Sequence, residues 1–535
     1  MRRGKLLIMK DNILVIDIGT QSLRASIVSP KGKILAFSKQ KYDVPFVSPE
    51  KGFAEQDVNY YLIELCKATK EIHESHGDLL DGVGGMIVDV FRDSTVILDE
   101  NKEPIRNAIL WLDQRVTRMD FNEYLKWYET ILFKLIGMGD TVKYNAQRTP
   151  TYWLMRHEPD NWKKLRYYAP LGAYFNYKIT GNLALSSADC NGHYPINFKT
   201  GKWYPRIHPK IDVFSIPMES LVPLVKVGDT IGKVTEEFSR LSMVPVGLPV
   251  FACGSDKACE TLGNGCIDKT SASISLGTAC TIEVVDDKYS EPEKFLPSYQ
   301  APYPGSYDLE VQIYCGLWML QWYIENFGHE DKEEAKRRNV SVEEILNEKI
   351  RDVPPGSDGL VLQPYWQPGL KRPNARGAIV GFSNVHTRYH LYKAIYEGLA
   401  FGLREGLDEI VRKIHKMPSY LVISGGGSNS KELCQIIADV FGLKCYISNE
   451  AESSTIGGAM AGLLDLGYYK TPEEAKKNMI QNGQCIQPDM SNHKIYDMLY
   501  KKVYLKMYPS MKKVYQSSKN FYLDVNEILK EKNKA

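Results

Sequence analysis

The stretch NILVIDIGTQSLRASIV (residues 12–28) decides the fold. It contains two β-rich apolar runs, 13–17 and 23–29, whose junction carries a carboxylate, a glycine and two hydroxyl side chains. A third apolar run follows at 33–38, after the turn sequence PKGK. Runs of this length that are separated by glycine-containing turns predict an antiparallel meander of strands.

A long helix is expected after the meander. Asp57 can cap a segment in which Val58, Leu62, Leu65 and Ile72 recur at near-helical spacing. Strands followed by an amphipathic helix are typical of an α/β domain.

The opening feature recurs about half a chain later. In SASISLGTACTIEVV (271–285), a second Gly-Thr pair stands between two β-rich runs, 258 residues after the first pair. A chain of 535 residues is also too long for one ordinary core. We therefore predict an α/β protein of two similar domains, residues 1–267 and 268–535.

A third glycine site lies in YLVISGGGSNSKELCQIIADVFGLKCYI (420–447). An apolar strand ends at Gly425–Gly427, and a helix capped by Ser428 or Ser430 and ended by Gly442 is expected to follow. A glycine loop before a helix N-terminus lets backbone N–H groups approach phosphate, which favours nucleotide binding. The segment matches neither the dinucleotide fingerprint nor the P-loop.

Charge and cysteine content exclude several classes of protein. The 67 Lys and Arg balance 65 Asp and Glu, so nucleic acid and membrane are not expected partners. Ten cysteines without a CxxC pair give no zinc pattern and favour a reducing, cytoplasmic location. The first residues, MRRGKLLIMKDN, have too short an apolar run for a signal peptide, and no targeting segment or membrane span is expected.

Taken together, the motifs resemble the FGGY carbohydrate kinases. In the order of that family they are IDIGTQSLRASIV, GFAEQD, RDSTVILDENKEPIRNAILWLDQR, GLPVFACGSDKACETLGNG, SISLGTA, NARGAIVGF with HLYKAIYEGLAFGLREGL, and SGGGSNSKELCQIIADVFG. The resemblance implies two actin-like (ribonuclease H-like) domains, each a mixed sheet flanked by helices, with an interdomain cleft. It also implies ATP and Mg²⁺ as cofactors and phosphorylation of a hydroxyl of a small sugar or polyol.

Two aspartates are expected to carry the chemistry. The resemblance makes Asp256 the general base, and a carboxylate can accept the hydroxyl proton during phosphoryl transfer. It also places Asp17 and Asp256 at the magnesium ion, which usually takes only one or two carboxylates. The alternatives are a helix N-cap for Asp256 and a polar turn for Asp17.

The resemblance assigns the phosphates and the adenosine to three turns. The two Gly-Thr pairs would clasp the phosphates from opposite domains, and the third glycine site would hold the adenosine. Arg24 could equally be an ordinary charge at a strand edge. The expected ATP-binding residues are Gly19, Thr20, Gln21, Arg24, Gly277, Thr278, Gly425, Gly426, Gly427 and Ser430.

Four residues are expected to bind the acceptor. Arg92 and Asp93 can act as donor and acceptor to vicinal hydroxyls, with a salt-bridged strand end as the alternative. Trp111 can stack on the carbon face of a polyol or lie in the core. Lys257 can contact a hydroxyl or be a helix charge. Phe91 stands where many relatives have glutamine, and this departure leaves the acceptor open.

Three functional readings remain at this stage. A sugar or polyol kinase leads, and an actin- or chaperone-like ATPase and a non-catalytic sugar sensor are the alternatives. Xylulose- or ribulose-like ketoses, glycerol, erythritol and gluconate all fit the acceptor residues. A homodimer stays open, since the tyrosine-rich segment from Tyr496 can form a packing face or close over its own domain.

Overall fold

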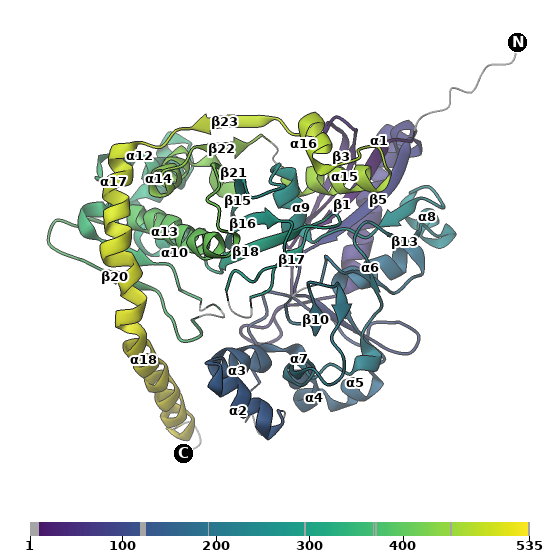
Figure 1. Ribbon diagram of the computed structural model, residues 1–535, viewed down its shortest axis with the longest axis horizontal. Coiled ribbons are helices and arrows are strands. Elements are labelled where there is room, and N and C mark those ends of the chain that lie inside the picture. Colours follow the sequence, from purple (N-terminus) through teal and green to yellow (C-terminus); the bar gives the residue numbers. More distant parts are fainter. Residues whose placement is uncertain are drawn as a thin grey trace, which may run out of the picture.

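The computed structural model describes residues 10–117, 123, 125–190, 192–293, 296–367, 369, 372–449 and 452–532. Two mixed sheets form its centre, one in each half of the chain (Figure 1). We call the elements up to α9 (Asp256–Gly263) the N-terminal half and those from β15 (Ser271–Leu276) the C-terminal half.

The first sheet has the order β13-β14-β5-β1-β2-β3. Strands β1, β2 and β3 are antiparallel neighbours, which confirms the predicted meander. Strand β1 pairs in parallel with β5, and β5 pairs in parallel with β14. The bounds are β1 (Asn12–Ile18), β2 (Ser22–Val28), β3 (Ile34–Lys41), β5 (Val83–Val90), β13 (Thr230–Lys233) and β14 (Pro249–Phe251).

The second sheet, β17-β18-β16-β15-β21-β22-β23, repeats this plan. Strands β15, β16 and β18 are antiparallel, β15 pairs in parallel with β21, and β21 does so with β22. The halves are therefore similar, as the repeated Gly-Thr pair predicts. The bounds are β16 (Cys280–Asp286), β17 (Tyr299–Gln300), β18 (Tyr307–Ile313), β21 (Tyr420–Ser424), β22 (Cys445–Ser448) and β23 (Asn482–Ile486).

Helices cover the sheets. The predicted helix is α1 (Val58–Asp81), and the Asp57 carboxylate accepts the Asn59 N–H at its start. Other helices of the N-terminal half are α2 (Trp127–Leu135), α3 (Gly139–Arg148), α4 (Pro150–His157), α5 (Pro159–Lys164), α6 (Leu171–Thr180), α7 (Pro209–Phe214) and α8 (Glu236–Ser242). Those of the C-terminal half are α10 (Trp318–Phe327), α11 (His329–Arg338), α12 (Val342–Lys349), α13 (Arg388–Ile414), α14 (Lys431–Phe441), α15 (Ser453–Asp465), α16 (Pro472–Met479), α17 (Met490–Leu499) and α18 (Leu505–Lys532).

Short strands complete the two halves. A four-stranded sheet in the N-terminal half has the order β4-β7-β6-β8, and helices α2 to α5 lie at the same end of the molecule (Figure 1). The bounds are β4 (Glu55–Gln56), β6 (Thr95–Leu98), β7 (Ala108–Ile109), β8 (Tyr167–Pro170), β9 (Leu185–Ser186), β10 (Ile196–Asn197), β11 (Lys202–Trp203), β12 (Leu224–Val225), β19 (Val361–Gln363) and β20 (Ala378–Val380).

Helices α9 and α15 join the halves. A Cβ on Gly263 would lie 1.8 Å from the Ser453 carbonyl, and one on Gly457 would lie 1.8 Å from the Cys259 carbonyl. The two helices therefore cross at a distance that only glycine permits. Each packs on the sheet of the opposite half, with α15 against β1 and α9 bonded to β15. The division of the chain at residue 267 stays a prediction.

The C-terminal tyrosines close over their own half. Tyr496, Tyr500 and Tyr504 are 1% exposed, and the Tyr496 hydroxyl donates to Glu397. They belong to the same core as the second sheet, so they are not a free packing face. Helix α18 continues away from the body of the molecule (Figure 1). None of the described helices is long and apolar enough to cross a membrane.

Candidate active site

The two Gly-Thr turns occupy equivalent places in the two sheets. Gly19 and Thr20 join β1 to β2, and Gly277 and Thr278 join β15 to β16. The Gly19 N–H donates to the Ser22 carbonyl, and the Gly277 N–H donates to the Ala279 carbonyl, both at 3.1 Å. A Cβ on Gly19 would stand 3.1 Å from the Ser22 oxygen, so this turn is tight on its inner side.

Asp17 is a buried carboxylate at the second-last residue of strand β1, and it is 4% exposed. The Ser454 hydroxyl donates to it at 2.8 Å from the first turn of α15. The Arg24 guanidinium lies 3.3 Å away on β2 and also pairs with Glu452 at 2.7 Å. The structure thus commits Arg24 to two carboxylates, and its predicted phosphate contact stays a prediction.

Asp89 is a second acid that the sequence patterns did not single out. It lies on β5 in register with Asp17 on β1, and it is 0% exposed. Neither of its carboxylate oxygens has a hydrogen-bond partner among the described residues. Burial, and then the charges of Asp17 and Asp256, raise the pKa of Asp89 well above its ordinary value.

Asp256 is the first residue of α9, and the N-cap position belongs to Ser255. The N-cap alternative is therefore wrong by one residue. The Asp256 carboxylate accepts the Lys257 N–H at 2.9 Å. Burial raises the pKa of Asp256 above its ordinary value, and the Asp17 charge adds to this, although Lys257 and Arg92 act in the opposite direction.

Arg92 joins the two halves. Its guanidinium donates to Glu310 on β18 at 2.7 Å and lies over the Tyr299 ring at 4.5 Å. Burial lowers the pKa of Arg92, but Glu310, Tyr299 and Asp256 raise it well above its ordinary value. Because the Arg92 charge also acts on Asp256 and Asp189, these three side chains share one electrostatic environment with Tyr299.

Asp93 faces a histidine. Its carboxylate lies 2.6 Å from Nδ1 of His193, and its φ of 65° is in the left-handed region, which non-glycine residues rarely adopt. Burial lowers the pKa of His193, but the Asp93 carboxylate raises it above its ordinary value. The strained backbone at this junction is consistent with a functional position.

The other two expected acceptor residues, and Phe91, have different surroundings. Trp111 is partly buried, and its Nε1 donates to the Thr20 hydroxyl of the first Gly-Thr turn at 3.0 Å. Lys257 donates from Nζ to Glu260 and Ser275 at 2.7 and 2.8 Å. Phe91 is 5% exposed and packs against Tyr61 in the core.

The third glycine site borders a cavity of about 710 Å³. Gly425 has φ of 80°, and a Cβ there would lie 2.6 Å from the Leu276 carbonyl beside the second Gly-Thr turn. Ser430, rather than Ser428, caps α14 and accepts the Leu433 N–H. The cavity brings together Gly277 and Thr278 with Gly426, Gly427 and Ser430.

Three further residues line this cavity that the sequence patterns missed. Trp318 is 43% exposed, which leaves its ring available for stacking. Asn347 donates to the Ser430 hydroxyl at 3.1 Å, and its own amide oxygen accepts from Tyr396 at 3.0 Å. No sequence pattern singles out these three residues, because each lies on a helix that is far from the glycine loop in the sequence.

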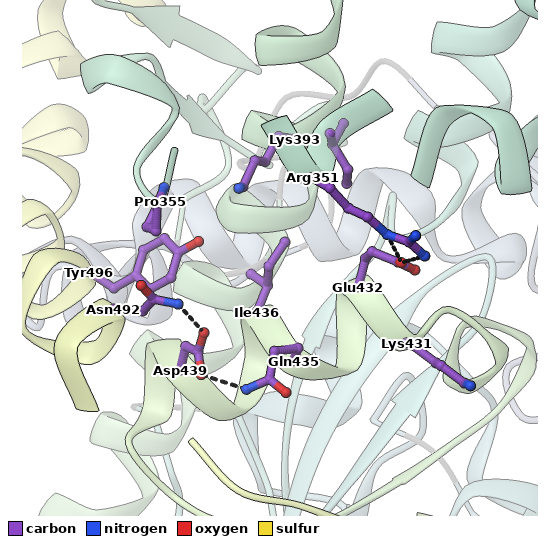
Figure 2. Close-up of a pocket in the computed structure, with 11 residues that line it drawn as sticks. Arg351, Pro355, Lys393, Lys431, Glu432, Gln435, Ile436, Asp439, Asn492 and Tyr496 are labelled. Carbon is purple, nitrogen blue, oxygen red and sulfur yellow. Dashed lines mark hydrogen bonds and ion pairs between the residues drawn. The ribbon is translucent and has the colours of Figure 1, made fainter. Parts of the chain in front are cut away.

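A smaller hollow of about 320 Å³ lies along another face of α14 (Figure 2). Gln435 and Asn492 both donate to Asp439 there, and Arg351 pairs with Glu432 (Figure 2). These polar groups satisfy one another, whereas the larger cavity meets the two glycine-bearing turns. The larger cavity is therefore the one that brings together the residues expected to bind ATP.

The carboxylates of Asp17 and Asp256 suit Mg²⁺ better than a metal ion whose ligands all come from the protein. Among the described residues, no three His, Cys, Asp or Glu side chains are grouped so as to hold a metal ion. Mg²⁺ keeps several waters and is usually bound by one or two carboxylates together with substrate phosphates. Asp17 and Asp256 would meet that requirement, since the Asp17 charge acts on Asp256.

Comparison with known proteins finds similarity over most of the chain. Residues 12–263 match the N-terminal domain, and residues 272–466 the C-terminal domain, of the FGGY family of carbohydrate kinases. Xylulose kinase of Lactococcus lactis is 25% identical over 495 residues, which are 91% of this chain and 95% of the relative.

Solved structures confirm the predicted fold. The xylulose kinase of Rhodospirillum rubrum has a TM-score of 0.79 at 22% identity and covers 94% of this chain and 100% of its own. The gluconate kinase of Lactobacillus acidophilus has a TM-score of 0.78 at 19% identity, with 95% and 99% covered. The chain has the two-domain actin-like ATPase fold.

Proposed function

The chain belongs to the FGGY family of carbohydrate kinases and phosphorylates a sugar or polyol with ATP, and we propose that Asp256 is the general base of this reaction. The observation that carries the proposal is the position of Asp256. It stands at the N-terminus of α9, and the charges of Arg92 and Asp17 both act on it. This supports a base that would lie between the proposed acceptor residues and the proposed phosphate turns.

The environment of Asp256 suits a base. A raised pKa makes a carboxylate a stronger proton acceptor. Asp256 would take the proton from the acceptor hydroxyl as its oxygen attacks the γ-phosphorus. Phosphoryl transfer asks little else of a protein than positioning and neutralisation of charge.

The remaining residues would hold the phosphates and the nucleotide. Asp17 and Asp256 would hold Mg²⁺, which neutralises phosphate charge when it is bound. The backbone of the two Gly-Thr turns would clasp the phosphates, and the cavity beside Gly426, Gly427 and Ser430 would take the adenosine. Gly426 supports this, because a Cβ there would meet nothing within 4 Å.

The acceptor would lie against Arg92, Asp93 and Trp111. The guanidinium offers donors, the Asp93 carboxylate offers acceptors, and an indole face suits the carbon side of a polyol. The relatives are named xylulose kinase and gluconate kinase, so ketoses, polyols and aldonates are the classes to test.

The test is ADP release with a panel of ketoses, polyols and aldonates, together with isolation of the phosphorylated product. Asp256→Asn should lower kcat by about 10²- to 10⁴-fold while ATP still binds. The matched control is Asp140→Asn, since Asp140 is an exposed acid in the first turn of α3. Near-normal turnover by Asp256→Asn would refute the assignment, and ADP release without a phosphorylated product would favour the ATPase alternative.

A further inference from the structure

Three cations beside the proposed acceptor residues are paired with carboxylates. Arg92 pairs with Glu310 at 2.7 Å, His193 with Asp93 at 2.6 Å, and Lys257 with Glu260 at 2.7 Å. An acceptor that carries a carboxylate would need a cation without such a partner, because removing an ion from water is costly unless it is paired.

We propose that Glu310 is a specificity-determining residue that neutralises Arg92, so that the cleft accepts uncharged ketoses or polyols and rejects aldonates. The inference rests on the proposed function, because it concerns the acceptor of the same reaction. It reduces the three acceptor classes to two.

The geometry makes the ion pair difficult to displace. The Arg92 side chain is 14% exposed and that of Glu310 is 7% exposed, so the pair is shielded from water and salt. Glu310 binds Nη2 of the guanidinium while Tyr299 covers its face. The planar fork is therefore oriented, and its remaining N–H groups can donate to neutral hydroxyls.

Burial raises the pKa of other carboxyl groups in this region, which disfavours their ionised form. Glu283 lies opposite Glu310 in the β16–β18 ladder, and burial, followed by the Glu310 charge, raises its pKa well above the ordinary value. Burial also raises the pKa of Asp189 well above its ordinary value, although Arg92 lowers it. A further carboxylate from an acceptor would meet the same penalty, together with repulsion from Glu310.

The test compares acceptors of equal carbon number that differ in charge. With D-xylulose, xylitol and D-xylonate, the unmodified enzyme should show at least a tenfold larger kcat/KM for one of the neutral compounds than for D-xylonate. Glu310→Gln should shift this ratio towards D-xylonate by about tenfold, which corresponds to 1.4 kcal/mol. Glu348→Gln is the control, because Glu348 pairs with Arg338 at the same 2.7 Å on the surface.

Each outcome has a definite meaning. Equal or better use of D-xylonate by the unmodified enzyme would overturn the inference, whether or not the variant folds. An unchanged ratio in folded Glu310→Gln would also overturn it. Glu310→Asp, which keeps the charge, should keep the preference for neutral acceptors. Failure of every ketose, polyol and aldonate to be phosphorylated would overturn the proposed function as well, whereas phosphorylation of both kinds at equal rates would overturn only the inference.

Discussion

The two halves of the molecule share one strand plan but place different side chains at equivalent positions. Two residues before the first Gly-Thr pair stands Asp17, and two residues before the second stands Ser275. The neighbouring parallel strand carries Asp89 in register with Asp17, and Ser424 in register with Ser275. One half therefore presents two acids where the other presents two serines.

The two serines hold a helix of the other half in place, whereas the acids are available for the proposed reaction. In the C-terminal half, Ser275 accepts from Lys257 and Ser424 donates to Glu260, so both serines hold helix α9. In the N-terminal half, Asp17 accepts a hydrogen bond from Ser454 of α15. A duplicated fold can thus keep its turns while only one copy carries the acids.

Removing the acid of the first copy should have the largest effect. Asp17→Asn makes that copy uncharged like the second, and we expect activity and apparent Mg²⁺ affinity to fall by about 10- to 100-fold. Steady-state rates over a range of Mg²⁺ concentrations measure both. Asp11→Asn, just before the same strand, should leave them unchanged, and equal Mg²⁺ dependence in the two variants would remove Asp17 from the metal site.

The helix crossing tests whether the two halves depend on each other for stability. Gly457→Ala places a Cβ against the Cys259 carbonyl, so the helices must separate, and we expect the free energy of unfolding to fall by about 1–3 kcal/mol. Chemical denaturation measures it.

The matched control is a glycine in an uncrowded helix. A Cβ on Gly77, which follows the kink of α1 at His76, would meet only His73, at 3.6 Å, so Gly77→Ala should change stability by less than about 1 kcal/mol. Equal effects of the two substitutions would show that α9 and α15 are not held at the distance described.

The C-terminal half also contains a buried acid that, like Asp89, lacks hydrogen-bond partners among the described residues. Asp308 on β18 has no hydrogen-bond partner for either oxygen among the described residues, and burial, then Glu310, raises its pKa to about 8. The folded state then binds this proton more tightly than the unfolded state. Stability should therefore fall as pH rises above the unfolded value of about 4, towards 8.

Asn at this position cannot titrate. Relative to the unmodified protein, Asp308→Asn should gain about 1 kcal/mol of unfolding free energy per pH unit between pH 5 and 7, measured by denaturation at each pH. A pH-independent difference would show that Asp308 is ionised in the folded state.

Local features of this site could be predicted from sequence. The two Gly-Thr turns and the glycine loop depend on neighbouring residues, so the patterns located them, and the meander and α1 followed from periodicity. The N-cap alternative for Asp256 is wrong by one residue, since an N-cap and an acid in the first turn look alike in sequence.

Features that depend on strand pairing could not be predicted. Asp89 meets Asp17 only because β1 and β5 are in parallel register, and Glu310 meets Arg92 only because the two halves face each other. Phe91, which follows β5, packs in the core against Tyr61. No local pattern contains that information.

The smallest expected effect concerns the contact that α15 makes with Asp17. Ser454→Ala removes a hydrogen bond to a charged group at 2.8 Å, and about 1 kcal/mol of orientation energy should be lost. This predicts a roughly fivefold rise in the Mg²⁺ concentration at half-maximal rate with little change in stability. Ser75→Ala, which removes a hydroxyl bonded to a backbone carbonyl on the surface of α1, should not alter it. If Ser454→Ala left the Mg²⁺ dependence unchanged, α15 would contribute only packing to the first half, and Asp17 would be held by its own strand and Arg24 alone.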